Sequence, residues 1–150
     1  MELNRLRVFL RRHRRIALDT SIFIYQLEAN ARYVPLTDPI FAWLEQPGHQ
    51  AVTSAITMTE LLVQPYRDSE ERRADELYGL LSTYPNLKWI APNLEIADLA
   101  AQFRARHGLR TPDALQAATA AQQHAAGFLT NDPVFERVGA FETLVLDHLL

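Results

Sequence analysis

Short apolar runs that alternate with longer helical segments constrain the fold of this chain most. Each run is only four or five residues long and is followed by a segment with helical character. Strands separated by helices in this way predict a parallel sheet with helices on both faces. Runs that are apolar along their whole length suit strands buried on both sides. The predicted strands are Ile16–Asp19, Gln50–Thr53, Leu87–Ala91, Gly127–Thr130 and Thr143–Leu146.

The segments between these strands carry helix start and stop signals. Pro39 suits an early helical position and Gly48 a helix end, while Pro65 suggests that the next helix ends near it. With 150 residues and no repeat or linker, the chain has the length of one ordinary domain. We therefore expect an α/β fold, a single three-layer domain. The predicted helices are 2–13, 21–30, 37–48, 56–66, 69–84, 93–108, 112–125 and 133–138.

The composition excludes several classes of protein. The chain has no cysteine, which rules out disulfides, zinc–thiolate sites and thiol nucleophiles. No apolar stretch approaches the roughly 18 residues that span a bilayer. The basic N-terminus is followed by only three apolar residues, Val8–Leu10, too few for a signal peptide. We expect a protein of the reducing cytoplasm that has no contact with a membrane.

The charge of the chain is unevenly distributed. The net charge is −3, yet six of the fifteen basic residues fall in the first fifteen positions, opposed there only by Glu2. The remaining residues carry nine basic and seventeen acidic side chains. Leu3, Leu6 and Leu10 share one face of the predicted first helix, so residues 1–14 read as a basic amphipathic helix. This pattern fits a nuclease with a basic arm, and it fits a solvated terminal helix equally well.

Four acidic residues lie where strands give way to helices. Asp19 ends the first strand, Glu60 follows the second, Asp132 follows the fourth, and Asp113 opens a helix beside them. In an open α/β sheet the carboxyl ends of the strands form one edge, where ligands bind. Four carboxylates at one edge would repel one another, so a hard cation is the natural occupant. The sequence therefore predicts metal-assisted phosphodiester chemistry.

Each acidic residue also has a structural explanation. Asp19 could cap the following helix, and Thr57–Glu60 has the pattern of a capping box. Asp113 lies in a first helical turn, where the helix dipole favours a carboxylate. Asp132 precedes a proline, and Asp-Pro commonly opens a turn. The functional interpretation depends on all four residues sharing one predicted edge of the sheet.

Four segments that contain these acids resemble the PIN domain, and most closely its VapC-like branch of prokaryotic endoribonucleases. The order and spacing of the segments agree with that family from about Arg15 to the C-terminus. The resemblance therefore implies a PIN-like nuclease domain over residues 15–150, preceded by the basic helix. The segments are Leu18–Ser21, Thr53–Leu62, Leu109–Thr119 and Phe128–Phe135.

The resemblance implies a sheet in the order 3-2-1-4-5 and RNA cleavage that depends on magnesium or manganese. By position, Asp19 and Asp113 would be the principal metal ligands. Glu60 and Asp132 would complete the acidic pocket directly or through water, with one or two ions bound. The residues expected to orient these ligands and their water are Thr20, Ser21, Thr130 and Asn131.

RNA binding requires basic side chains, because contacts to phosphates dominate the affinity for nucleic acid. Arg110 lies three residues before Asp113 and is the best placed, and Arg15 with the basic arm comes next. Proteins that this chain resembles pair with a small antitoxin and commonly form homodimers. They usually begin near their first strand, so the additional helix could be an RNA arm, a partner surface or simple packing.

Two alternatives remain open. A PIN-like module could bind RNA or protein without cutting it, although the presence of all four acids argues against this. A phosphatase with Asp19 as the nucleophile would need a lysine near the phosphate, and the chain has only Lys88, at the start of a strand. The aspartate that the dehalogenase pattern requires two residues later is Ser21 here.

Overall fold

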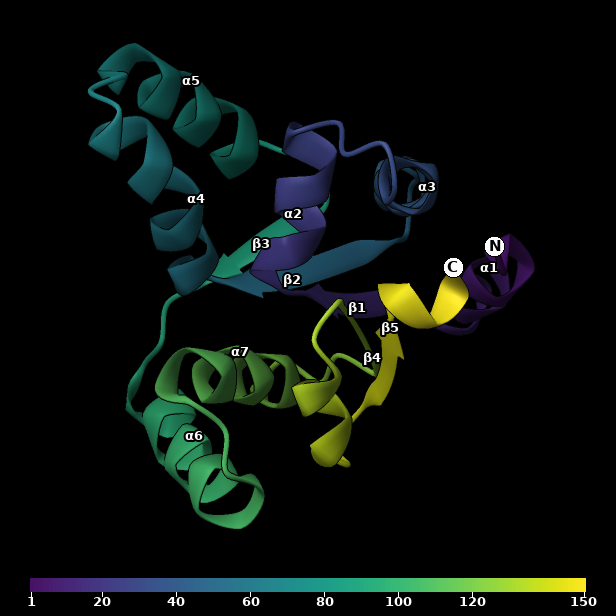
Figure 1. The fold of residues 1–150 in the computed structure, drawn as a ribbon. Coiled ribbons are helices and arrows are strands. Elements are labelled where there is room, and N and C mark those ends of the chain that lie inside the picture. Colours follow the sequence, from purple (N-terminus) through teal and green to yellow (C-terminus); the bar gives the residue numbers. More distant parts are fainter.

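A central parallel sheet organises the chain, which the computed structural model describes from Met1 to Leu150 (Figure 1). Its strands lie in the order β3-β2-β1-β4-β5, and all neighbouring strands are parallel. The predicted three-layer α/β architecture and the predicted strand order are therefore confirmed. The strands are β1 (Arg15–Leu18), β2 (Gln50–Ser54), β3 (Leu87–Ile90), β4 (Gly127–Thr130) and β5 (Glu142–Val145).

Strand β1 lies at the centre of the sheet and marks the point where the strand order reverses. Ile16 of β1 is in register with Ala51 of β2 on one side and with Gly127 of β4 on the other. Ile16 and Leu18 are almost fully buried, as expected for a strand covered on both faces. The carboxyl ends of β1 and β4 thus flank the crevice where ligands bind in open α/β sheets.

Helices cover both faces of the sheet. In Figure 1, α2 and α3 lie above it, α6 and α7 lie below it, and α4 with α5 forms a pair beside α2. One buried cluster includes Phe23 and Ile40 on the first face, and another includes Phe103 and Phe128 on the second. The helices are α1 (Leu3–Arg12), α2 (Thr20–Leu27), α3 (Val34–Leu44), α4 (Ala55–Arg67), α5 (Glu71–Ser82), α6 (Leu94–His107) and α7 (Thr111–Gln122), with 3-10 helices η1 (Pro133–Arg137) and η2 (Leu146–Leu149).

Two helix boundaries differ from the sequence prediction because the prolines act differently. Helix α3 begins at Val34 rather than Thr37, since Pro35 occupies its first turn and Pro39 lies inside the helix. Helix α4 continues through Pro65 to Arg67. A proline in the first turn removes no helical hydrogen bond, whereas an interior proline removes one that other contacts must offset. The remaining helix ends lie within a few residues of the prediction.

Helix α1 packs against the domain instead of projecting from it. Its apolar residues Leu6, Phe9 and Leu10 are buried in the same core cluster as residues of α2 and α3. The N–H of Glu2 donates a hydrogen bond to the carbonyl of Leu149 at 2.6 Å, and the two chain ends lie side by side in Figure 1. Packing is therefore one role of this helix, while its arginine-bearing face remains exposed.

None of the helices combines the length and apolar character that crossing a membrane requires.

We expect the substitution Gly127→Ala to test how closely α1 packs on β4. A Cβ atom at position 127 would lie 2.6 Å from Phe9 Cζ and 2.9 Å from His13 Cδ2. Because Phe9 is buried, the free energy of unfolding should fall by about 1–3 kcal/mol, as measured by urea denaturation. The control is Gly79→Ala in α5, where a Cβ meets nothing within 4 Å. It should be as stable as the wild type or more stable by up to about 1 kcal/mol; equal stability of both variants would contradict the packing.

Candidate active site

Asp19 follows β1 and lies at the N-terminus of α2, so it occupies the crevice beside the central strand. Its carboxylate accepts hydrogen bonds from the Ser21 backbone N–H at 3.0 Å and from the Ser21 hydroxyl at 2.5 Å. Thr130, the last residue of β4, donates a hydrogen bond to the other carboxylate oxygen. Asp19 is therefore the N-cap of α2, and it also joins two neighbouring strand ends.

The burial of Asp19 has an electrostatic consequence. Only 7% of the residue is exposed, and this burial raises the pKa of Asp19 to about 6. Hydrogen bonds from Ser21 and Thr130 act in the opposite direction, because they stabilise the ionised form. The carboxylate is thus ionised at neutral pH at a cost in free energy that a bound cation would offset.

Glu60 does not belong to a capping box, contrary to the structural alternative considered for it. Helix α4 begins at Ala55, and its cap is Ser54, whose hydroxyl accepts a hydrogen bond from the Ile56 N–H at 3.2 Å. A serine at the end of β2 therefore replaces Thr57 as the cap. Glu60 lies one turn further along, and its Oε1 accepts a hydrogen bond from the Thr20 hydroxyl at 2.7 Å.

Asp113 and Asp132 approach from two further elements. Asp113 lies in the first turn of α7, and its carboxylate is 3.2 Å from Nε of Arg110. Asp132 follows β4 and caps η1 by accepting a hydrogen bond from the Val134 N–H at 2.9 Å. The structural explanations proposed for both residues are therefore met, and neither excludes a second role.

All four acidic residues line one cavity of about 370 Å³. No group of three or more His, Asp or Glu side chains is already arranged around a metal position. The two observations agree, because each carboxylate is held by a partner of its own. Asp19 is held by Ser21 and Thr130, Glu60 by Thr20, Asp113 by Arg110, and Asp132 by the Val134 N–H. The structure thus brings the four carboxylates to a shared cavity without gathering them on one point. The other lining residues are Thr20, Ser21, Ile24, Tyr25, Gln116, Asn131 and Phe135.

The predicted positioning residues make three kinds of contact. Ser21 and Thr130 donate to Asp19, and Thr20 donates to Glu60. Asn131 contacts no carboxylate side chain. Its Nδ2 donates to the Tyr25 hydroxyl at 2.9 Å, and its Oδ1 accepts from the backbone N–H of Asp147 at 2.8 Å.

The two arginines predicted to contact RNA lie in different places. Arg110 is 80% exposed and stands next to Asp113 at the cavity. Arg15 begins β1 and therefore lies at the opposite edge of the sheet from Asp19. Its guanidinium donates to the Gln50 side chain at 2.7 Å and to the Gln123 carbonyl at 2.6 Å. The structure does not bring Arg15 to the acidic cavity, because the whole length of β1 separates Arg15 from Asp19.

A chain of buried hydrogen bonds beneath the cavity fixes the orientation of Gln116. The hydroxyl of Thr53 donates to the Leu18 carbonyl at 2.8 Å, so Thr57 must be the donor in the 2.8 Å contact between the two threonines. Thr57 in turn accepts from Gln116 Nε2 at 2.8 Å. The amide oxygen of Gln116 makes no hydrogen bond and is not among the fully buried polar atoms that lack one. It therefore offers a free acceptor to the cavity that Gln116 lines.

Sequence reasoning missed the apolar lining residues Ile24 and Phe135 and two polar ones, Gln116 and Tyr25. Gln116 lies three residues after Asp113 on α7, so the helical period could have placed the two on one face. Tyr25 stacks on Tyr33 with ring centroids 4.0 Å apart and accepts a hydrogen bond from Asn131. No local pattern pointed to Tyr25, because its position depends on contacts between distant segments.

The family of the chain follows from comparison with known proteins. A family model described as the PIN domain matches residues 16–140. The chain belongs to the PIN-domain family. A search of curated proteins finds no match. The acidic cavity of this PIN domain lies within the matched residues, and α1 lies outside them.

Solved structures share the fold of this PIN domain. VapBC2 from Rickettsia felis, bound to a DNA fragment from its promoter, has a TM-score of 0.69 at 19% identity, covering 87% of this chain and 98% of that one. FitAcB from Neisseria gonorrhoeae has a TM-score of 0.66 at 25% identity, covering 89% and 99%. VapC20 from Mycobacterium tuberculosis, described as a Sarcin-Ricin loop cleaving toxin, has a TM-score of 0.65 at 20% identity, covering 83% and 95%.

We expect Asp19→Asn to stabilise the metal-free protein in a pH-dependent way. Burial raises the pKa of Asp19 to about 6, so the folded state holds this proton more tightly than the unfolded state. Its ionisation therefore lowers the stability of the wild type as the pH rises from about 4 to above 6. In EDTA the variant should be more stable than the wild type by up to about 3 kcal/mol near pH 7.5, and should lose that advantage near pH 4. A stability difference that does not change with pH would contradict this account.

The direction of the hydrogen-bond chain predicts that Gln116→Glu is destabilising. A carboxylate can only accept hydrogen bonds, and the hydroxyl hydrogen of Thr57 is already donated to Thr53. Either the bond between residues 116 and 57 or the bond between Thr57 and Thr53 is therefore lost. The free energy of unfolding should fall by about 2 kcal/mol or more, as measured by denaturation at pH near 8. Gln46→Glu on the exposed surface is the matched control and should be nearly neutral. A neutral Gln116→Glu would mean that the amide is oriented the other way.

Proposed function

We propose that this PIN domain is a metal-dependent endoribonuclease, acting as the toxin of a toxin–antitoxin pair. The observation that carries the proposal is the single cavity lined by Asp19, Glu60, Asp113 and Asp132. These residues come from four different elements, and they meet at the carboxyl edge of the sheet beside the point where the strand order reverses. A pocket of this kind suits an ion and a phosphodiester more than an apolar ligand.

The donor set of the cavity fits magnesium or manganese. Both ions prefer oxygen ligands, and the cavity offers four carboxylates together with the free Gln116 amide oxygen. Magnesium keeps several waters and needs only one or two protein carboxylates, so a preassembled set of three is not required. Asp19 and Asp113 would hold the ion, with Glu60 and Asp132 acting directly or through water. Such an ion polarises a phosphate and lowers the pKa of a bound water.

The protein's own residues prepare this chemistry by holding the carboxylates in place. Ser21 and Thr130 fix both oxygens of Asp19, and Thr20 fixes one oxygen of Glu60. Both carboxylates line the cavity. The amide oxygen of Gln116 can accept a hydrogen bond from a water or a sugar hydroxyl that enters with the substrate.

Arg110 is suited to receive RNA at the mouth of the cavity. Its guanidinium is mostly exposed and now pairs with Asp113. An incoming phosphate would compete for the guanidinium, and a cation would compete for the carboxylate. Substrate and ion binding would therefore support each other: a phosphate that binds Arg110 frees Asp113 for the ion, and an ion that binds Asp113 frees Arg110 for the phosphate.

An antitoxin partner is part of the proposal. The solved structures that share this fold include a toxin–antitoxin complex from Klebsiella pneumoniae and the VapBC complexes. We propose that a small antitoxin covers the acidic cavity here, and that the toxin forms a homodimer. Exposed apolar side chains on α4 and α5, namely Tyr66, Tyr78 and Leu80, are consistent with contacts between proteins.

The phosphatase alternative lacks a lysine at the cavity. Lys88 lies on β3, where its Nζ donates to the Gln123 side chain at 3.2 Å, and it does not line the acidic cavity. The cavity therefore lacks the lysine that such enzymes need beside a phosphoryl group.

Cleavage of RNA is the direct test of the proposed function. The wild type should cleave a mixed pool of RNA with magnesium or manganese and should stop when EDTA is added. Asp19→Asn and Glu60→Gln should each lower kcat/KM by about 100-fold or more, because each removes a charge at the cavity. Both variants should still bind RNA in EDTA.

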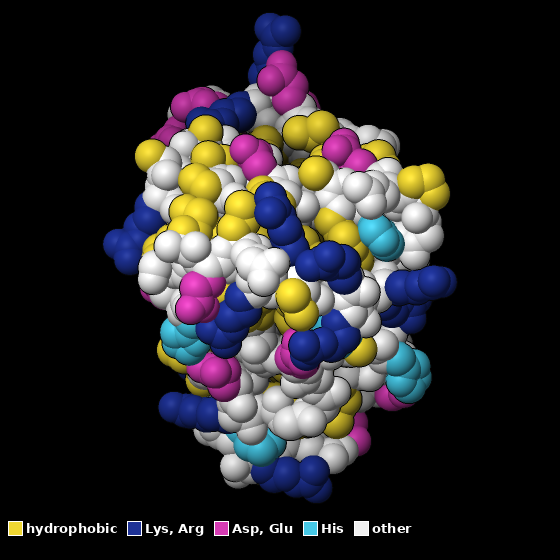
Figure 2. Space-filling model, turned by 90° about the vertical axis from the view of Figure 1, so that its right-hand side faces the viewer, with side chains coloured by type: hydrophobic (Ala, Val, Ile, Leu, Met, Phe, Trp, Pro, Cys, Tyr) yellow, Lys and Arg dark blue, Asp and Glu magenta, His cyan; other side chains and the backbone are white.

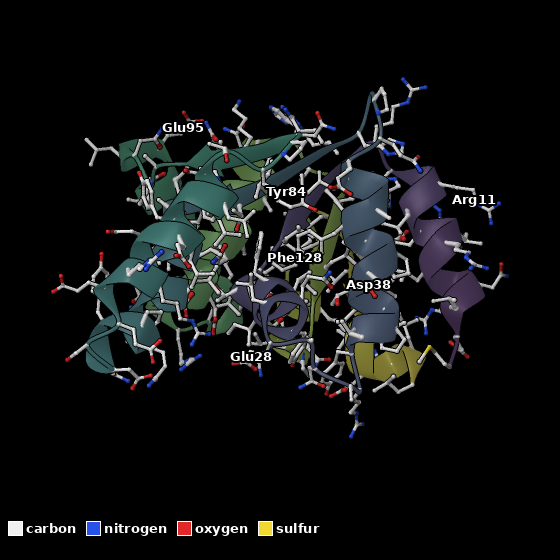
Figure 3. All side chains as sticks on the ribbon, turned by 90° about the horizontal axis from the view of Figure 1, so that it is seen from above. Arg11, Glu28, Asp38, Tyr84, Glu95 and Phe128 are labelled. Atoms are coloured by element: carbon white, nitrogen blue, oxygen red, sulfur yellow. The ribbon has the colours of Figure 1, made fainter.

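The control variant Glu95→Gln changes an exposed carboxylate in α6, labelled in Figure 3, and should cleave RNA at the wild-type rate. If Asp19→Asn cleaved RNA as fast as the wild type, the proposal would lose its basis. RNA binding without cleavage by the wild type, in the presence of either ion, would favour the non-catalytic module instead.

A further inference from the structure

Three exposed arginines lie on α1 and on the segment that follows it. Arg7 and Arg11 are four positions apart in α1 and therefore lie on the same side of the helix, whereas Arg14 lies in the short turn between the end of α1 and the start of β1. All three are exposed. Figure 3 shows the Arg11 side chain pointing away from the body of the protein. Figure 2, which views the side where α1 lies, shows basic side chains gathered over the middle of that face.

These three arginines have no partner within the protein. Most basic side chains are held by a carboxylate or by a polar group; Arg5 pairs with Glu2 and Arg12 with Glu142, for example. Five basic side chains make neither an ion pair nor a hydrogen bond, and three of the five are these arginines. The five are Arg7, Arg11, Arg14, Arg67 and Arg106.

The rest of the molecule is poorly suited to holding a polyanion. Beyond the first fifteen residues the chain carries nine basic and seventeen acidic side chains. The cavity itself is lined by four carboxylates, and its nearest arginine, Arg110, is paired with one of them. Since contacts to phosphates supply most of the affinity for RNA, a substrate needs positive charge elsewhere on the surface.

The groove between α1 and α3 adds a second observation. It has a volume of about 320 Å³, and Arg7 and Arg11 line it together with the apolar residues Leu10, Pro39 and Trp43. Guanidinium groups beside an apolar floor match a nucleotide, because they contact phosphate while the base lies against apolar surface. The groove therefore favours a nucleic acid over a simple counterion.

We propose that Arg7, Arg11 and Arg14 form a second RNA-binding surface, which holds the phosphate backbone of a long RNA outside the acidic cavity. The inference rests on the proposed function for the identity of RNA as the substrate. Helix α1 and Arg14 lie outside the residues that match the PIN-domain family.

Contacts within the structure connect this surface to the cavity. The start of α1 binds η2 through the hydrogen bond from the Glu2 N–H to the Leu149 carbonyl. In η2, the Asp147 N–H bonds to Asn131, which lines the cavity. These bonds place the start of α1 beside η2, and η2 beside the cavity. Arg14 directly precedes β1 and lies at the opposite edge of the sheet, so an RNA must be long to reach from the cavity to all three arginines.

The test compares the triple variant R7Q/R11Q/R14Q with the wild type in EDTA, where cleavage is prevented. The probe is a labelled, unstructured RNA of about 30 nucleotides, and binding is followed by fluorescence anisotropy over a range of salt concentrations. The dissociation constant of the variant should rise at least about 10-fold at about 50 mM salt. The slope of log K against log salt should become shallower by about 2, because three phosphate contacts are lost.

The matched control is R67Q/R106Q, which removes two equally exposed and unpartnered arginines from α4 and α6. Its affinity for the RNA should stay within about twofold of the wild type. Thermal denaturation should show that both variants remain folded, since the substituted side chains are all exposed. Wild-type binding by the triple variant would overturn the inference, and so would an equal loss per charge in the control.

Substrate length gives an independent readout with the magnesium-loaded protein. The loss of kcat/KM in the triple variant should be largest for the long RNA and should shrink as the RNA is shortened. A loss of kcat/KM that is the same at every RNA length would overturn the inference. It would also be overturned if the triple variant bound RNA like the wild type but no longer bound an acidic protein partner. If the wild type binds RNA through α1 but never cleaves it, the proposed function fails while the surface stands.

Discussion

The burial of the Asp19 carboxylate at the end of the central strand is the constraint around which this structure is arranged. The group is almost inaccessible to solvent, which raises the pKa of Asp19 to about 6 and makes its ionised form costly. Hydrogen bonds from Ser21 and Thr130 offset part of that cost, and they tie the start of α2 to the end of β4. Buried ionisable groups with shifted pKa values cluster at functional sites, and binding a cation in the adjoining cavity would be such a function for Asp19.

A second polar network supports the same region from below. It runs from the Leu18 carbonyl through Thr53 and Thr57 to Gln116, linking β1, β2, α4 and α7. Because the carbonyl can only accept, every donor in the network has a fixed direction. The network thereby fixes which way the Gln116 amide is turned: its nitrogen binds Thr57 and its oxygen is the one acceptor of the network left without a hydrogen bond.

The acidic and basic side chains of this protein gather in two different places. Acidic groups gather at the carboxyl edge of the sheet, while unpaired arginines follow the outer face of α1. The apolar face of α1 is buried in the core beside α2 and α3, so the helix holds its arginines at fixed positions on the domain. An acidic centre suited to a metal ion and a basic surface suited to a polyanion can coexist because the fold keeps them apart.

The sequence alone determined the architecture and the four carboxylates, because both depend on local patterns. Alternating short strands and helices predicted the parallel sheet, and the position of Asp19, Asp113 and Asp132 at element boundaries predicted a shared edge. Tertiary structure decided which groups each side chain meets. Arg15 belongs to the far edge, Glu60 binds Thr20 instead of capping α4, and Gln116 and Tyr25 join the cavity. The physical reason is that periodicity reports which face of an element is buried, whereas hydrogen bonds between distant segments determine where a polar side chain points.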